Sequence, residues 1–138
     1  MFENLQVYQK AIDLADQVSA LTGKFPRGYY YLVSQLNRAA LSVAANFAEG
    51  NGRFTKADRR NFFGIASGSV PECVPLLELA GRQKLLEPSH QRQMKADLEE
   101  IAKMPSGLIN GLDRRQRSRA DSAAPALRKS FTNRALRH

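Results

Sequence analysis

The side chains best suited to do chemistry in this sequence follow one face of a predicted helix over residues 29–49. They recur every three or four residues, the spacing that aligns side chains along a helix, and they are Gln35, Arg38, Ser42, Asn46 and Glu49. No histidine, cysteine or close pair of carboxylates accompanies them within this segment, so neither acid–base nor nucleophilic catalysis is expected. We therefore interpret this polar stripe as structural, because a buried Asn or Ser often selects one packing register between helices.

The polar stripe needs partners on a neighbouring element, because Arg38 and Glu49 lie roughly 16 Å apart along the helix and cannot pair with each other. The Gly-Asn-Gly sequence at 50–52 predicts a turn into an antiparallel helix. That turn places Arg38 opposite residues 67–72 and leaves Glu49 near the arginines that follow the turn. The predicted partners are Ser69 and Glu72 for the first half of the stripe, and Arg53 or Arg59 for Glu49.

The same helix is apolar on more than one face. The face predicted to meet the core consists of Leu32, Leu36, Ala39, Ala40, Val43 and Phe47. Much of the remaining circumference is also uncharged, and consists of Val33, Leu41, Ala44, Ala45 and Ala48. Since one side of every helix in a four-helix bundle faces outward, covering this surface requires another chain, and a homo-oligomer is predicted. The alternative is that the alanines are good helix formers that tolerate water.

The first predicted helix spans about residues 5–22. It ends at Gly23, which is expected to provide a left-handed cap, and Pro26 prevents its continuation. Its predicted core face consists of Leu5, Tyr8, Ala11, Ile12, Ala15 and Val18.

The third predicted helix begins after Thr55, which is expected to cap it with its side chain, and reaches about residue 86. Pro71 and Pro75 fall inside it. Because each proline removes a backbone donor and clashes with the preceding turn, we expect a kink over residues 67–75. Its core positions are Phe62, Phe63, Ala66, Val70, Leu76 and Leu79.

The fourth predicted helix has Ser89 as its N-cap and is interrupted near Pro105 and Gly107. Its core positions are Met94, Leu98, Ile101, Leu108 and Leu112. Four helices with short connections predict an all-α, up-down-up-down antiparallel four-helix bundle. The alternative is a three-helix core with a loose fourth helix.

Positive charge is concentrated at the C-terminal end. The net charge is +8, yet residues 114–138 hold eight basic residues and one acidic residue, which leaves residues 1–113 nearly neutral. We therefore divide the chain into a helical domain, 1–113, and a basic tail, 114–138, that is expected to be disordered. The candidate nucleic-acid contacts are Arg53, Arg59 and Arg60 in the domain, and Arg114, Arg115, Arg117 and Arg119 in the tail.

Several functional classes find little support in the residues. Cys73 is the only cysteine, and neither histidine has a partner at metal-ligand spacing, so no metal, cofactor or small-molecule substrate is expected. No secretory leader and no run of about 20 apolar residues is evident, which favours a cytoplasmic protein without a membrane span. An enzyme is not expected.

The segment from Gln35 to Gly50, QLNRAALSVAANFAEG, resembles the signature of the four-helix bundle proteins encoded in intervening sequences of 23S ribosomal RNA genes, the S23-type family. The further matching segments are Phe2-Glu3-Asn4-Leu5, Phe25-Pro26, Asn51-Gly52-Arg53, and residues 62–69 followed by Glu72. The resemblance covers about residues 2–112. It implies a ring-like homopentamer. It also implies a relationship to the accessory variability proteins of diversity-generating retroelements, which bind nucleic acid and a reverse transcriptase through a basic surface.

Three features depart from that family pattern: the nearly neutral bundle, the Pro105-Ser106-Gly107 interruption, and the basic tail. The function expected from residues and resemblance together is a non-catalytic oligomeric interaction protein that binds RNA or a ribonucleoprotein. The alternatives are a protein-binding adaptor for a reverse transcriptase, and a purely structural oligomer. Retention on RNA at low salt separates the first from the other two, since phosphate contacts are salt-dependent.

Overall fold

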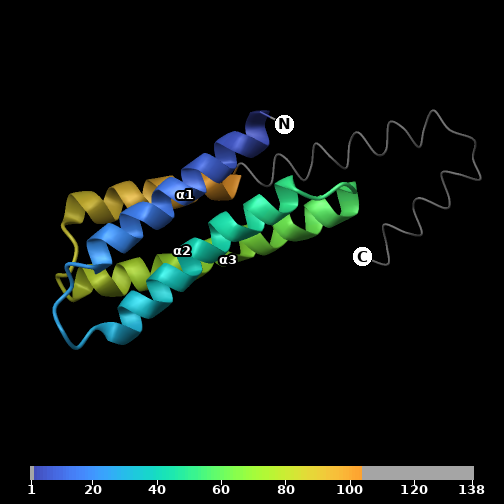
Figure 1. The fold of residues 1–138 in the computed structure, drawn as a ribbon. Helices are drawn as coiled ribbons and strands as arrows, with labels where there is room; N and C mark the ends of the chain where they lie inside the picture. Colours follow the sequence, from blue (N-terminus) through green and yellow to red (C-terminus); the bar gives the residue numbers. More distant parts are fainter. Residues whose placement is uncertain (1, 104–138) are drawn as a thin grey trace, which may run out of the picture.

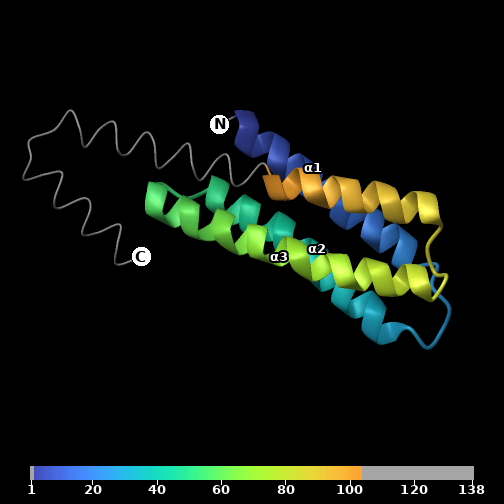
Figure 2. The same cartoon turned by 180° about the vertical axis from the view of Figure 1, so that it is seen from behind.

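A computed structural model describes residues 2–103 as four helices (Figure 1). Helices α1 (Phe2–Thr22), α2 (Tyr30–Asn51) and α3 (Lys56–Arg82) are followed by a fourth helix seen over residues 88–103. Within residues 2–103 there is no strand. Seen from behind, the fourth helix lies along α1, while α2 and α3 lie side by side (Figure 2).

All four helices contribute to one hydrophobic core. Every predicted core residue of α2 is buried, and Met94, Leu98 and Ile101 bring the fourth helix into the same cluster. The four-helix prediction is therefore confirmed, and the alternative of a loose fourth helix is wrong. The buried core of the first three helices includes Val7, Ala11, Leu14, Val18, Leu32, Leu36, Val43, Phe47, Phe63, Ala66, Val70 and Leu77.

Helices α2 and α3 approach closely next to the turn that joins them. A Cβ added to Gly50 would lie 2.6 Å from Cε1 of Phe63, so a glycine is needed for the ring to pack against the α2 backbone. The Phe63 ring also meets Phe47, with ring centroids 6.0 Å apart and planes tilted by 44°. Thr55 caps α3 as predicted, because its hydroxyl accepts a hydrogen bond of 3.1 Å from the Asp58 amide.

The core face of α1 differs from the prediction. Leu5 was expected in the core but is 56% exposed, whereas Val7 and Leu14 are buried. Tyr8 and Ile12 lie at the edge of the core and are partly buried. Ala11 and Val18 are buried as predicted. The core face of α1 is therefore centred slightly away from the predicted one, so that it includes Val7 and Leu14 and leaves out Leu5.

The connection from α1 to α2 also corrects a predicted cap. The residue with left-handed backbone is Gly28, at φ 102°, and not Gly23. The amide of Gly23 instead continues the helical pattern with a bond of 3.1 Å to the Ser19 carbonyl.

Helix α3 ends four residues before the predicted position of about 86. Lys84 has a positive φ of 59°, its amide bonds to the Gly81 carbonyl, and the Leu85 amide bonds to the Ala80 carbonyl at 2.9 Å. These two bonds form a Schellman motif, which ends a helix by reversing the chain. A left-handed lysine gives no recognisable signal in sequence, since glycine is usual at that position.

The remaining helix predictions have mixed outcomes. Helix α3 continues through Pro71 and Pro75 without a break. The fourth helix begins at Pro88, so Ser89 lies inside its first turn and is not the N-cap. Proline is well suited to the first helical position, because the amide that it lacks has no partner within the helix there. The Gln91 amide bonds to the Glu87 carbonyl at 3.0 Å, as expected for this start.

Some predictions fall on residues outside the described range of 2–103. These are the interruption at Pro105 and Gly107, the core positions Leu108 and Leu112, the expected disorder of the basic tail, and the candidate contacts Arg114, Arg115, Arg117 and Arg119.

Candidate functional site

The centre of the polar stripe is a small hydrogen-bonded cluster between α2 and α3. The hydroxyls of Ser42 and Ser69 lie 3.0 Å apart and join the two helices. The Asn46 amide group donates to the Ser42 carbonyl at 2.8 Å and approaches the Ser42 hydroxyl at 3.3 Å, and Ser69 donates back to the Ile65 carbonyl at 3.1 Å. The cluster therefore satisfies its own hydrogen-bonding groups, which fits a register device better than a reactive site.

Other members of the polar stripe are not brought together. The Ser42–Ser69 contact lies one helical turn away from Arg38 on α2. The predicted ion pair between Arg38 and Glu72 is wrong, because none joins them within residues 2–103 and both residues are exposed. Gln35 is also exposed. These three side chains line the outer surface of the α2–α3 pair.

A second polar link joins α1 to α2 and is absent from the predicted stripe. The Asn37 amide group donates to the Thr22 hydroxyl at 2.9 Å and to the Val33 carbonyl at 2.8 Å. Thr22 is buried and donates to the Val18 carbonyl at 2.7 Å. Asn37 lies on the opposite edge of α2 from Ser42, so the two links hold α2 from both sides.

We expect Asn46→Leu to change assembly or helix register more than helix content. The variant loses the bonds to Ser42, whose net worth is about 0.5–1.5 kcal/mol each, and places an apolar group beside the outer surface of α2. Circular dichroism should therefore remain close to that of the native protein, while light scattering reports a changed mass. Gln9→Leu, at an exposed position of α1, is the matched control. An unchanged oligomer in Asn46→Leu would contradict the register role of the stripe.

The basic residues beside the α2–α3 turn form an ordered group that we call the apex, residues 49–60. Glu49 and Arg53 form an ion pair at 3.2 Å, as predicted. The Arg53 guanidinium carbon also lies 4.6 Å above the centre of the Phe62 ring, a cation–π contact. Arg59 does not reach Glu49; its Nε donates to the Arg53 carbonyl at 2.8 Å.

One side chain of the apex was not singled out by the sequence. Phe54 lies in the turn between Arg53 and Thr55 and is 98% exposed. Arg60 is half-buried in the first turns of α3. The sequence signal that could have identified Phe54 is an aromatic residue inside a polar, basic turn. Its exposure is informative because a phenyl ring gains nothing from complete exposure to water.

Cys73 is buried on α3, and its thiol is 3.7 Å from the Ser69 carbonyl. Burial, with a smaller contribution from the charge of Glu72, raises the pKa of Cys73 to about 11. Because the thiolate is the reactive form, a raised pKa makes this cysteine a poor nucleophile near neutral pH.

We expect native Cys73 to react with a disulfide reagent at pH 8 about a hundredfold more slowly than the unfolded chain, since each pKa unit is worth a factor of ten in thiolate below the pKa. The folded pKa lies above the ordinary value of 9.0. The stability gained from the neutral thiol is therefore complete below pH 9 and declines as the pH rises towards 11. Labelling with and without denaturant measures the rate difference. Equal rates would contradict the burial of this thiol.

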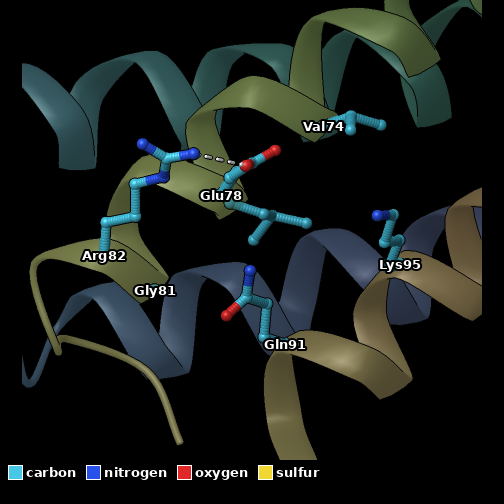
Figure 3. A pocket seen from close by; sticks show the side chains of 7 residues that line it. Val74, Glu78, Gly81, Arg82, Gln91 and Lys95 are labelled. Carbon is cyan, nitrogen blue, oxygen red and sulfur yellow. Dashed lines mark hydrogen bonds and ion pairs between the residues drawn. The ribbon is translucent and has the colours of Figure 1, made fainter. Parts of the chain in front are cut away.

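A surface pocket of about 360 Å³ lies between α3 and the fourth helix (Figure 3). Glu78 and Arg82 pair across one turn of α3 at 3.2 Å, and Gln91 and Lys95 project from the facing helix. Glu78 is the carboxylate among the lining residues, and it is already paired with Arg82. Among the predicted site residues that the structure describes, none lines this pocket.

A smaller pocket of about 310 Å³ separates α1 from the fourth helix. Lys10 and Glu100 pair across it at 2.9 Å, which ties the first helix to the last. Asp13 and Asp97 also line it. Across the described part of the chain, no group of three or more His, Cys, Asp or Glu side chains is placed to hold a metal ion.

Within residues 2–103, α3 is the one helix that is long and apolar enough to cross a membrane by length and composition. This is weak evidence for insertion, because the core helix of a soluble protein passes the same test. One face of α3 already packs into the shared core through residues such as Phe63 and Val70.

Comparison with known proteins identifies a family and a similar solved structure. The family model described as 23S rRNA-intervening sequence protein matches residues 3–107. A crystal structure of a protein with unknown function, from the S23 ribosomal protein family of Bacteroides thetaiotaomicron VPI-5482, is similar with a TM-score of 0.70 and 24% identity. The similarity covers 78% of this chain and 98% of that one, and at this identity it concerns the fold. No curated protein matches.

Proposed function

Because this chain belongs to the family of 23S rRNA-intervening sequence proteins, we propose that it is a non-catalytic interaction protein that assembles with copies of itself and binds RNA. The observation that carries the assembly is the uncovered apolar surface of α2. Leu41 is 57% exposed, and Ala45 and Ala48 are exposed on the same side of the helix. A neighbouring subunit would remove this surface from water, which is the main driving force of association between proteins.

The adjacent face of α3 supports the same interface. Ile65 is 45% exposed, and a Cβ added to Gly64 or Gly68 would meet no atom within 4 Å. Exposed glycines destabilise a helix by about 1 kcal/mol each relative to alanine. Their presence on an outer face is explained if another backbone approaches closely there. The proposed assembly is a homopentamer of up-down-up-down antiparallel bundles, in which the number five follows from the family resemblance.

The absence of catalysis is proposed from the chemistry of the polar groups. Ser42, Asn46 and Ser69 use their hydrogen-bonding groups on one another and on backbone carbonyls. Arg38 and Glu72 are exposed and separate. The raised pKa of Cys73, about 11, keeps the only thiol protonated at neutral pH.

RNA binding is proposed from charge and from the family. The net charge of +8 favours a polyanionic partner. In the helical domain, Arg53 and Arg59 are held at the apex by the contacts described above. In sequence, Arg114, Arg115, Arg117 and Arg119 add a second basic group in the tail.

The test compares the full chain with a chain that lacks residues 114–138, by RNA filter binding over a range of salt concentrations. Each phosphate contact to single-stranded RNA adds about 0.7 to the slope of log affinity against log salt. We expect the full chain to bind at low salt and to weaken steeply as salt rises, and the truncated chain to show a flatter slope. No binding by the full chain at low salt would overturn the proposed function. If the truncated chain bound RNA as tightly as the full chain, the tail would have no part in the proposed binding.

The competing function is a protein adaptor, for example for the reverse transcriptase of a retroelement. The apolar outer face of α2 could serve a foreign protein as well as a second copy of the chain. Capture of a reverse transcriptase that survives nuclease treatment and high salt would favour the adaptor, because phosphate contacts are lost under those conditions.

A further inference from the structure

The apex combines an aromatic side chain in water with cations held beside it. Phe54 is 98% exposed, whereas the nearby Phe62 carries the Arg53 guanidinium on its ring. Arg53 is further held by Glu49, and Arg59 is held by the Arg53 carbonyl. Arg53 and Arg59 are thus held by three separate contacts, while the ring of Phe54, next to Arg53 in the chain, is almost fully exposed.

We propose that the apex binds single-stranded RNA, with Phe54 as the side chain on which a base stacks and Arg53 and Arg59 as the groups that meet the flanking phosphates. This inference rests on the proposed RNA binding and names the form of the RNA and the residue that recognises it. Proteins that bind single strands combine a positive surface with aromatic rings on which bases stack. The apex brings both within one short turn.

Charge and exposure favour this occupant over an apolar protein partner. Four basic side chains, at positions 53, 56, 59 and 60, accompany Phe54, against acidic side chains at 49 and 58, and one of those acids is already paired with Arg53. A single exposed ring among cations suits a planar base between phosphates, whereas a protein partner would require a broader apolar patch. A duplex is less suitable, because its bases are already stacked within the helix.

The chain contains no tryptophan, so Phe54→Trp creates a single fluorescent reporter that keeps an aromatic surface. We expect a short oligouridylate to quench this tryptophan at low salt. The oligouridylate should bind the Phe54→Trp protein about as tightly as the native chain. Phe54→Ala should bind the same oligonucleotide about tenfold more weakly. Binding to a duplex of equal length should be the same in both proteins. Because Phe54 packs against no core residue, circular dichroism should show all variants folded.

Two controls make the outcome specific. Tyr30→Ala removes an exposed aromatic side chain at the other end of α2 and should leave oligouridylate binding unchanged. Phe54→Leu keeps an apolar group but cannot stack, so it should behave like Phe54→Ala; binding as tight as native would overturn stacking. Suppose that the native chain binds RNA, that Phe54→Ala binds it equally well, and that RNA does not quench Phe54→Trp. Stacking on Phe54 is then wrong, while the proposed RNA binding stands. If the native chain binds no RNA at low salt, both the stacking and the proposed function are wrong.

Discussion

Replacing Phe63 with alanine should lower the free energy of unfolding by about 3–5 kcal/mol, the range measured for large aromatic residues removed from protein cores. The Phe63 side chain is 1% exposed, packs against Phe47, and fills the space above Gly50. The cavity left by the ring has rigid walls, since both helices meet there at close range. Because domains of this size have a free energy of unfolding of only about 5–15 kcal/mol, the variant should lose a large part of its stability.

Urea denaturation followed by circular dichroism measures this change at constant protein concentration, which matters for any chain that associates. Phe54→Ala is a matched control, because it removes the same ring from a position that is almost fully exposed. We expect that control to shift the free energy of unfolding by less than about 0.5 kcal/mol. If both phenylalanines gave equal losses, the packing of α3 against α2 would be wrong.

Leu41→Arg should abolish the oligomer without unfolding the subunit. Leu41 lies on the outer side of α2, so an arginine there is solvated in a lone subunit and costs little. In an interface that covers Leu41, the same arginine must lose its water, at an effective cost of several kcal/mol per charge. About 1.4 kcal/mol changes a dissociation constant tenfold, so assembly at micromolar concentration should be lost. Size-exclusion chromatography with light scattering measures the mass of native and variant proteins.

Ala96→Arg adds the same charge at an exposed position of the fourth helix and serves as the control for Leu41→Arg. We expect it to retain the native mass. A native protein that behaves as a stable single subunit would end the oligomer proposal. If the Leu41→Arg protein kept the native mass, the interface would have to lie on another face of the subunit.

Local features of the helices could be predicted where one residue type has one clear role. Thr55 was recognised as the cap of α3, and the pairing of Glu49 with Arg53 or Arg59 was predicted because the turn places these arginines near it. The end of α3 could not be predicted, because the left-handed residue there is Lys84 instead of glycine. Which residue ends a helix depends on how the following loop packs, and that packing cannot be read from the local sequence.

The candidate site was predicted in part for a related reason. Ser42, Asn46 and Ser69 do meet, because the chain turns over residues 52–55 and brings α3 back along α2. The sequence indicated this return, with the turn placed slightly earlier, at 50–52. Arg38 and Glu72 do not meet, because side chains leave a helix about 100° apart from one residue to the next, and the rotation of α2 and α3 leaves these two exposed. The exposure of Phe54 could not be predicted, because it depends on where every other residue lies.

The sequence alone determined that the described chain is helical, and that α2 is its central apolar element, because a 3.6-residue period and a wide uncharged circumference are properties of composition and spacing. The tertiary structure decided the exact core face of α1, which buries Val7 and Leu14 beside the predicted Ala11 and Val18 and leaves Leu5 exposed. It also decided which polar groups of α2 and α3 are within bonding distance. Both choices depend on the rotation of each helix about its axis, and that rotation is set by the simultaneous packing of all four.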